Sequence, residues 1–154
     1  MPSFAAVILV DPRGWVLLQE RDEHAPIDPE RWGLVGGHLE DGEEFEPAAH
    51  RELAEETGVV LPAGELALWR ELAVDHTASH GTVDRMQVFV GSTSHTDADI
   101  VCGEGRQIVF VAPESARTLH LTAAATDIVP AFLDSDVYAS VRSVRARGAR
   151  RPAR

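Results

Sequence analysis

The sequence predicts a single domain of the mixed α/β class, in which strands pack against one strong central helix and a terminal helix. With 154 residues, of which 44% are hydrophobic, the chain is long enough to bury one core. Short apolar, β-branched segments alternate with turns that contain Pro and Gly. A helical period begins only after about residue 44 and returns near the end of the chain. This alternation favours layers of sheet and helix.

The first strands are expected as a hairpin. Residues 4–10 are apolar and β-branched, residues 11–14 (DPRG) form a turn, and residues 15–19 continue as the second strand. Residues 21–30 carry two prolines and several charges, which is typical of a loop. The segment RWGLVGG at 31–37 is predicted to be a short strand that ends in a pair of glycines.

Later strands are expected in the middle of the chain, at 66–74, 86–92 and 107–111. The segments between them are rich in His, Thr, Asp and Gly, and we predict that they are loops. One of them, DHTASHG, contains His76 and His80, which are four residues apart. Because the segment is expected to be a loop, this spacing does not indicate a metal site, and we expect both histidines to be solvated.

Two helices are predicted. The first covers residues 44–57, with Pro47 in its first turn and Gly58 at the position of a C-cap. Its apolar stripe, at helical spacing, consists of Phe45, Ala48, Ala49 and Leu53. The second covers residues 122–141 and is expected to be interrupted or kinked near Pro130.

The charge of the chain restricts its partners. The net charge is −11, all fourteen basic side chains are Arg, and six of them lie in residues 142–154. The remainder is therefore more acidic than the whole, which disfavours nucleic acid and favours metal cations, or anions whose charge a metal masks. We expect residues 1–141 to form the domain and residues 142–154 to form a flexible, solvated tail rather than a nucleic-acid-binding arm.

Two features of the sequence predict a cytoplasmic protein. No stretch of eighteen apolar residues is present that could cross a membrane, and the beginning, MPSFAAVILVDPRG, lacks the basic region of a signal peptide. The single cysteine, Cys102, cannot form an internal disulfide. A homodimer is left open as an alternative to a monomer.

The most informative segment is GHLEDGEEFEPAAHRELAEETGV, residues 37–59, which places eight carboxylates around one Arg. On a helix Glu52, Glu55 and Glu56 share one face, where their like charges repel. A hard divalent cation such as Mg²⁺ or Mn²⁺ would offset this repulsion, because carboxylate oxygens suit these ions whereas Zn²⁺ favours His or Cys. Gly37 lets the backbone approach such an ion closely and leaves its carbonyl oxygen as a ligand.

This segment resembles the Nudix box, G-x5-E-x7-R-E-U-x-E-E-x-G-U, in which U is a bulky apolar residue. The upstream segments VLLQER and RWGLVGG are weakly similar to strands of the same family. All the specified positions of the box match, at Gly37, Glu43, Arg51, Glu52, Leu53, Glu55, Glu56, Gly58 and Val59.

The resemblance implies the Nudix fold, a mixed sheet between helices (α/β/α) with the box as a loop–helix–loop. It also implies hydrolysis of a small-molecule nucleotide derivative, a nucleoside diphosphate linked to another moiety, with Mg²⁺, for which Mn²⁺ can substitute. Carried over by position, the metal ligands are the Gly37 carbonyl and the carboxylates of Glu52, Glu55 and Glu56.

The remaining roles also follow from the resemblance. Either Glu52 or Glu55 helps to deprotonate water, and Arg51 and Glu43 hold the geometry. Outside the box, Glu104 lies between two glycines and is either a further metal ligand or general base, or an ordinary turn carboxylate.

The substrate class is less closely specified. Arg21 resembles a substrate-facing residue of some relatives, and a surface arginine is the other interpretation. The resemblance favours a compact, MutT-like hydrolase of nucleoside triphosphates or related nucleotides, with nucleotide-sugars as the competing class. The alternative is a non-catalytic Nudix-fold domain that binds nucleotides or regulates, but such domains usually have a degraded box and this box is complete.

Overall fold

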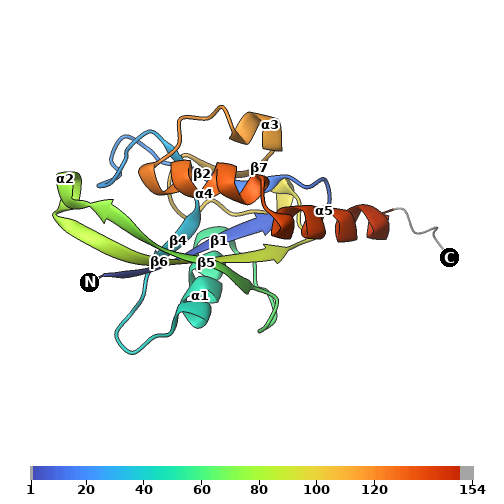
Figure 1. The fold of residues 1–154 in the computed structure, drawn as a ribbon, viewed down its shortest axis with the longest axis horizontal. Coiled ribbons are helices and arrows are strands. Elements are labelled where there is room, and N and C mark those ends of the chain that lie inside the picture. The colour runs from blue at the N-terminus through green and yellow to red at the C-terminus, as the bar shows by residue number, and fades with distance from the viewer. Residues whose placement is uncertain (1, 150–154) are drawn as a thin grey trace.

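The computed structural model describes residues 2–149 (Figure 1). No helix among these residues is long and apolar enough to cross a bilayer. The strands are β1 (Ser3–Val10), β2 (Val16–Glu20), β3 (Trp32–Gly33), β4 (Val35–His38), β5 (Ala67–His76), β6 (Thr82–Ser92) and β7 (Gln107–Val111). The helices are α1 (Phe45–Thr57), α2 (Thr77–His80), the 3₁₀ turn η1 (Asp97–Asp99), α3 (Pro113–Ala116), α4 (Ala123–Leu133) and α5 (Asp136–Ala149).

All seven strands join in one mixed sheet around β1. β1 runs parallel to β6 from the pair Ser3↔Arg85 to the pair Val10↔Ser92, and antiparallel to β4 along its first half. β1 meets β2 only at its far end, where the predicted hairpin turn lies. β7 and β3 pair with β2, and β5 forms a long hairpin with β6.

β1 is buried on both faces, and its side chains alternate between two hydrophobic clusters. The first cluster contains Ala6, Ile8 and Val10 of β1 with Ile128, Val129 and Phe132 of α4. The second contains Ala5, Val7 and Leu9 with Ala48, Ala49 and Leu53 of α1. α1 and α4 accordingly cover opposite sides of the sheet (Figure 1), which confirms the predicted α/β/α layers.

α1 forms where the sequence predicts it. Glu44 is the N-cap, and the apolar stripe faces the sheet with Ala48, Ala49 and Leu53 fully buried. The helix ends at Gly58, whose φ of 77° is in the left-handed region and whose N–H donates to the carbonyl of Ala54. This end fixes where the last carboxylates of the helix lie.

The segment between β5 and β6 is not the loop that the sequence predicts. β5 continues to His76, and Thr77–His80 form one helical turn, α2, before Gly81. The carboxylate of Asp75 starts this turn by accepting hydrogen bonds from the backbone N–H and the hydroxyl of Thr77. Since strand pairing extends to the pair His76↔Thr82, His76 is part of the sheet rather than of a solvated loop.

The terminal helical region also differs from its prediction. Pro130 lies inside α4, and the break comes later, at Asp134 and Ser135, where α4 ends and α5 starts. α5 extends to Ala149, so residues 142–149 are helical rather than part of a flexible tail, in keeping with the strong helix propensity of Arg and Ala. Residues 150–154 lie outside the described residues, and the domain boundary that we place after residue 141 stays a prediction.

Candidate active site

A cleft of about 470 Å³ opens where the end of β4 meets α1 and the loop that precedes β7. Three predicted site residues of the 37–59 segment line it, and two predicted residues from elsewhere in the chain join them. These five residues are Gly37, Glu52, Glu56, Arg21 and Glu104. The fold therefore brings both groups of candidate residues to one place, whereas Glu43, Arg51 and Glu55 do not line the cleft.

Gly37 and Glu52 lie against each other. A Cβ atom at Gly37 would be 2.4 Å from both Cδ and Oε1 of Glu52, far closer than real Cβ contacts. Only glycine at this point of β4 leaves room for the carboxylate beside the strand. The close approach places the Gly37 backbone next to a carboxylate, as the sequence predicts for two ligands of one cation.

Glu56 is the most unusual group in the cleft. Its side chain is 8% exposed, and its Oε2 atom is buried and accepts no hydrogen bond from the described part of the chain. Burial raises the pKa of Glu56 to about 8, and the negative charges of Glu52 and Glu104 add to this effect. A backbone hydrogen bond from Gly36 and the positive charge of Arg21 act in the opposite direction.

Arg51 holds the other carboxylates of α1. Its Nε and Nη2 atoms donate to the two oxygens of Glu43, both at 2.8 Å, so the predicted pairing across the helix start is present. Its Nη1 atom donates to Glu52 at 2.7 Å and to Glu55 at 3.2 Å. The hydrogen bond from Arg51, followed by that from the Glu40 backbone, lowers the pKa of Glu43 to about 2. Glu43 is therefore an ionised anchor for Arg51.

The three carboxylates of the helix face do not all point into the cleft. The side chain of Glu55 is 59% exposed and reaches only Arg51, although it shares a face with Glu52 and Glu56. The sequence pattern places these residues on one face, but the direction of each side chain depends on its neighbours.

The loop that carries Glu104 is attached to the C-terminal end of α1. The Val101 N–H donates to the Thr57 carbonyl at 2.9 Å, and the Gly103 N–H donates to the Glu56 carbonyl at 2.8 Å. The side-chain amide of Gln19 donates to the Glu104 carbonyl at 2.8 Å. Although Glu104 is exposed, these bonds keep it at the cleft, close enough for its charge to act on Glu56.

Arg21 is inside the cleft rather than on the open surface. It lies at the end of β2, and its guanidinium donates to the carbonyl of Ile27. Burial lowers the pKa of Arg21, and the negative charges of Asp28, Glu104 and Glu56 counteract this. The group supplies a positive charge within electrostatic range of Glu56 and Glu104.

The donor set fits a hard divalent cation. Within residues 2–149 no group of three or more His, Cys, Asp or Glu side chains is already arranged to hold a metal ion. However, the buried oxygen of Glu56 has no hydrogen-bond donor, and the carboxylates of Glu52 and Glu104 raise its pKa instead of offsetting its charge. A hard cation such as Mg²⁺ would satisfy all three, because these ions take oxygen ligands.

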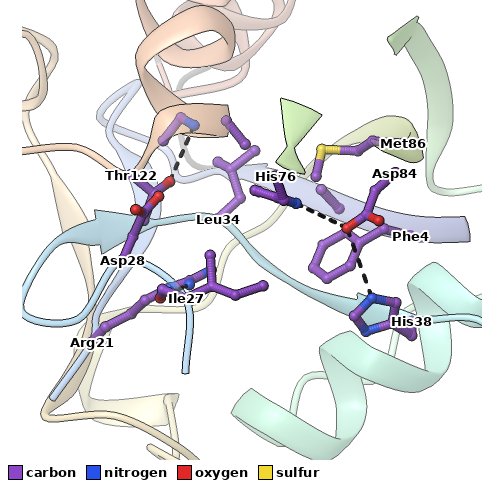
Figure 2. A pocket seen from close by; sticks show the side chains of 13 residues that line it. Phe4, Arg21, Ile27, Asp28, Leu34, His38, His76, Asp84, Met86 and Thr122 are labelled. Carbon is purple, nitrogen blue, oxygen red and sulfur yellow. Dashed lines mark hydrogen bonds and ion pairs between the residues drawn. The ribbon is translucent and has the colours of Figure 1, made fainter. Parts of the chain in front are cut away.

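Sequence reasoning missed two residues near this cleft, Asp84 and His76. Asp84 is 3% exposed, and the side chain of His76 is 11% exposed rather than solvated. Their side chains meet at 3.0 Å between His76 Nδ1 and Asp84 Oδ2 (Figure 2). A signal was present, since Asp84 is in phase with the buried Met86 and Val88 at the strand period of two.

Comparison with known proteins identifies the family of the chain. Residues 1–132 match the family model described as the NUDIX domain. An RNA pyrophosphohydrolase of Caulobacter vibrioides is 49% identical over 53 residues, which are 34% of this chain and 30% of that protein. The nucleoside triphosphatase NudI of an Enterobacter species is 29% identical over 121 residues, or 75% of this chain and 86% of that protein. The matched part of the chain thus spans less than a third of the first relative and most of the second.

Solved structures show the same fold at low sequence identity. The ORF135 protein of E. coli has a TM-score of 0.67 and 23% identity, with 99% of this chain and 95% of that chain covered. The NUDIX domain of NrtR from Shewanella oneidensis, complexed with ADP ribose, has a TM-score of 0.68 and 17% identity, with 83% of each chain covered. Because the family model covers most of the chain and the structural likeness extends over the whole sheet, this chain belongs to the Nudix family.

Proposed function

We propose that this protein is a metal-dependent hydrolase that cleaves a nucleoside diphosphate linked to another moiety, with Mg²⁺ as the metal and Mn²⁺ as a substitute. The observation that carries the proposal is the buried Glu56 oxygen without a donor, beside Glu52 and Glu104 in a large cleft. The preferred substrates are nucleoside triphosphates or related nucleotides, with nucleotide-sugars as the competing class. The names of the relatives, an RNA pyrophosphohydrolase and a nucleoside triphosphatase, support this chemistry.

Two further parts of the proposal are a small-molecule substrate and a cytoplasmic location, which the acidic chain and its single cysteine support. The net charge of −11 favours a small-molecule substrate over nucleic acid as the partner. Cys102 is a free thiol, which is the common state in the cytoplasm.

In this proposal the metal would be held by the Gly37 carbonyl, Glu52, Glu56 and Glu104, and Glu55, which here is exposed and contacts Arg51, would have to turn toward the ion to join them. A bound divalent cation would neutralise the diphosphate oxygens and lower the pKa of a bound water. Arg21, which also lines the cleft, attracts and orients the negatively charged phosphates.

The proton of the attacking water goes to a carboxylate, and the contacts favour one candidate. One oxygen of Glu52 already accepts a hydrogen bond from Arg51 at 2.7 Å, and Glu55 does not line the cleft. Glu104 lines the cleft on a loop that three hydrogen bonds hold in place. We therefore assign the proton to the Glu104 carboxylate, while Arg51, anchored by the ionised Glu43, positions Glu52.

The test is release of phosphate or pyrophosphate from a panel of nucleoside triphosphates, nucleotide-sugars and dinucleotides, with Mg²⁺ and with Mn²⁺. Glu56→Gln keeps the size of the side chain but removes its charge, so we expect turnover to fall by roughly a hundredfold or more. Glu65→Gln is the matched control, because Glu65 is exposed and does not line the cleft, and it should turn over like the wild type.

Titration of Mn²⁺ into both variants by calorimetry separates binding from turnover. We expect Glu56→Gln to lose most of the Mn²⁺ affinity that Glu65→Gln retains. An active Glu56→Gln protein contradicts the metal assignment. Metal binding by the wild type without turnover of any substrate in the panel supports the non-catalytic alternative instead.

A further inference from the structure

A second, smaller cavity of about 40 Å³ adjoins the cleft on the side of the β5–β6 hairpin (Figure 2). Its walls are largely apolar, and Leu34 and Met86 contribute to them. The two cavities have lining residues in common, namely Phe4, Arg21, Ile27, Leu34 and His38. A ligand in the cleft can therefore extend one of its ends into the small cavity.

The most deeply buried charged side chain of the small cavity is the carboxylate of Asp84, which is 3% exposed. The other charged or polar side chains of its lining are Arg21, Asp28, His38, His76 and Thr122. The Oδ2 atom of Asp84 lies 3.0 Å from His76 Nδ1 and 4.0 Å from His38 Nε2, and its Oδ1 atom accepts a hydrogen bond from the Thr82 hydroxyl at 3.2 Å. These contacts fix the carboxylate in one orientation. An ionised carboxylate has about four acceptor positions, so Asp84 can accept further hydrogen bonds from a ligand.

The size and polarity of the small cavity define what enters it. About 40 Å³ holds a few water molecules or the edge of a heterocycle, but not a whole purine. The ring system must then lie in the larger cleft, where Phe4 and Ile27 offer apolar surface. Because an ionised carboxylate only accepts hydrogen bonds, the part of the edge that meets Asp84 must carry N–H donors.

Among the common nucleobases, guanine presents such an edge. Its ring N1–H and its exocyclic 2-amino group are neighbouring donors that one carboxylate can accept together. Adenine instead turns the unprotonated N1 acceptor toward this position, and hypoxanthine lacks the amino group. Donor and acceptor positions on the base thus decide which nucleotides fit.

We propose that Asp84, oriented by His76, recognises the nucleobase and selects guanine nucleotides. The inference rests on the proposed nucleotide hydrolysis in the adjoining cleft. It adds a specificity-determining residue on β6, outside the 37–59 segment and apart from the carboxylates that hold the metal.

The competing interpretation is that Asp84 only holds His76 in the β5–β6 hairpin. Asp84→Asn separates the two, because asparagine keeps an acceptor oxygen for His76 but replaces the second acceptor with an N–H donor. Xanthine carries a carbonyl in place of the 2-amino group of guanine, so an asparagine at this position pairs with xanthine. A purely structural residue would not produce this exchange of preference.

The experiment compares kcat/KM for the triphosphates of guanosine, inosine, xanthosine and adenosine. For the wild type we expect guanosine to exceed inosine by roughly ten- to hundredfold, since loss of the amino group leaves a buried acceptor unpaired. For Asp84→Asn we expect the order of guanosine and xanthosine to reverse. Asp75→Asn is the matched control, because Asp75 is exposed on the same hairpin and does not line either cavity.

Binding of the corresponding monophosphates without divalent metal, measured by calorimetry, makes the inference independent of catalysis. Preferential binding of guanosine monophosphate supports it even if no nucleotide is hydrolysed, in which case only the proposed function fails. Equal kcat/KM values and equal affinities of the wild type for guanosine and inosine nucleotides overturn the inference while leaving the proposed hydrolysis intact. Retention of the guanine preference in Asp84→Asn overturns it as well.

Discussion

Glu56 holds a proton at neutral pH because the protein buries it beside the charges of Glu52 and Glu104. Its pKa is raised from 4.5 to about 8, so the folded protein binds this proton more tightly than the unfolded chain. The stability that this provides is complete below about pH 4.5 and is lost as the pH rises to about 8. At the scale of a single residue, the cost of ionising Glu56 is on the order of a few kcal/mol.

We therefore predict that metal-free protein loses stability between pH 5 and pH 8, and that Glu56→Gln removes most of this loss. The free energy of unfolding, measured by denaturant titration with a chelator at several pH values, checks this. Saturating Mn²⁺ should raise the wild-type stability at pH 8 and leave that of Glu56→Gln nearly unchanged, because the cation replaces the proton only on a carboxylate. A pH-independent wild-type stability over this range would show that Glu56 ionises without cost.

At the scale of the element, the loop before β7 packs closely against the end of α1 at Gly103. A Cβ atom at this position would lie 2.9 Å from the Glu55 carbonyl oxygen and 3.0 Å from that of Glu56. Both oxygens belong to the backbone rather than to a flexible side chain, so the loop itself has to move if a larger residue replaces Gly103. Movement of this loop carries Glu104 away from the cleft.

We predict that Gly103→Ala lowers both stability and turnover. Overpacking at a backbone contact costs about 1–3 kcal/mol, and the displaced Glu104 reduces kcat. Glu104→Gln is the comparison, because it should reduce kcat without the loss of stability. Thermal unfolding together with kcat on the best substrate of the panel distinguishes the two. Wild-type turnover in Gly103→Ala would show that the position of this loop is not important.

Elements whose determinants are local could be predicted, and α1 is the clearest case. The stripe of Ala48, Ala49 and Leu53 and the stop at Gly58 depend only on neighbours within two turns of helix. The pairing of Arg51 with Glu43 could also be predicted from the sequence, because the two residues are only eight positions apart. These local features are the reason that the carboxylates of α1 could be predicted from the sequence.

The features that sequence reasoning missed depend on contacts between distant segments. The direction of Glu55 is set by Arg51 and by exposure, not by its helix face. The burial of His76 and Asp84 results from the register of β5 against β6, which extends the pairing to His76↔Thr82. The extension of helix α5 beyond residue 141 was missed because its Arg content indicated a solvated tail, whereas the same residues favour helix.

At the scale of the whole molecule, the first turns of α5 pack on the core although they follow the end of the family match at residue 132. Tyr138 is 5% exposed, packs edge-on against Phe132, and donates its hydroxyl to the Gly14 carbonyl at 2.6 Å. This bond ties the helix to the β1–β2 turn, at the other end of the sequence.

We predict that Tyr138→Phe lowers the free energy of unfolding by about 1–2 kcal/mol, because it leaves the buried Gly14 carbonyl without a donor. Turnover should be unchanged, since neither residue lines the cleft. Val137→Ala, at the 41% exposed neighbour on the same helix, should change the free energy by less than about 0.5 kcal/mol. Equal stabilities of the two variants would contradict a structural role for this bond.

The parallel pairing of β1 with β6 determines when a growing polypeptide can complete the candidate site. Residues 37–59 leave the ribosome before β6, yet β1 lacks its parallel neighbour until about residue 92 has been made. Until then α1 has only β4 and an incomplete sheet to pack on, and such long-range pairing forms slowly. The nascent chain thus carries most of its acidic residues well before it has the sheet on which they are arranged, and the cleft is complete only after Glu104 and β7 have followed.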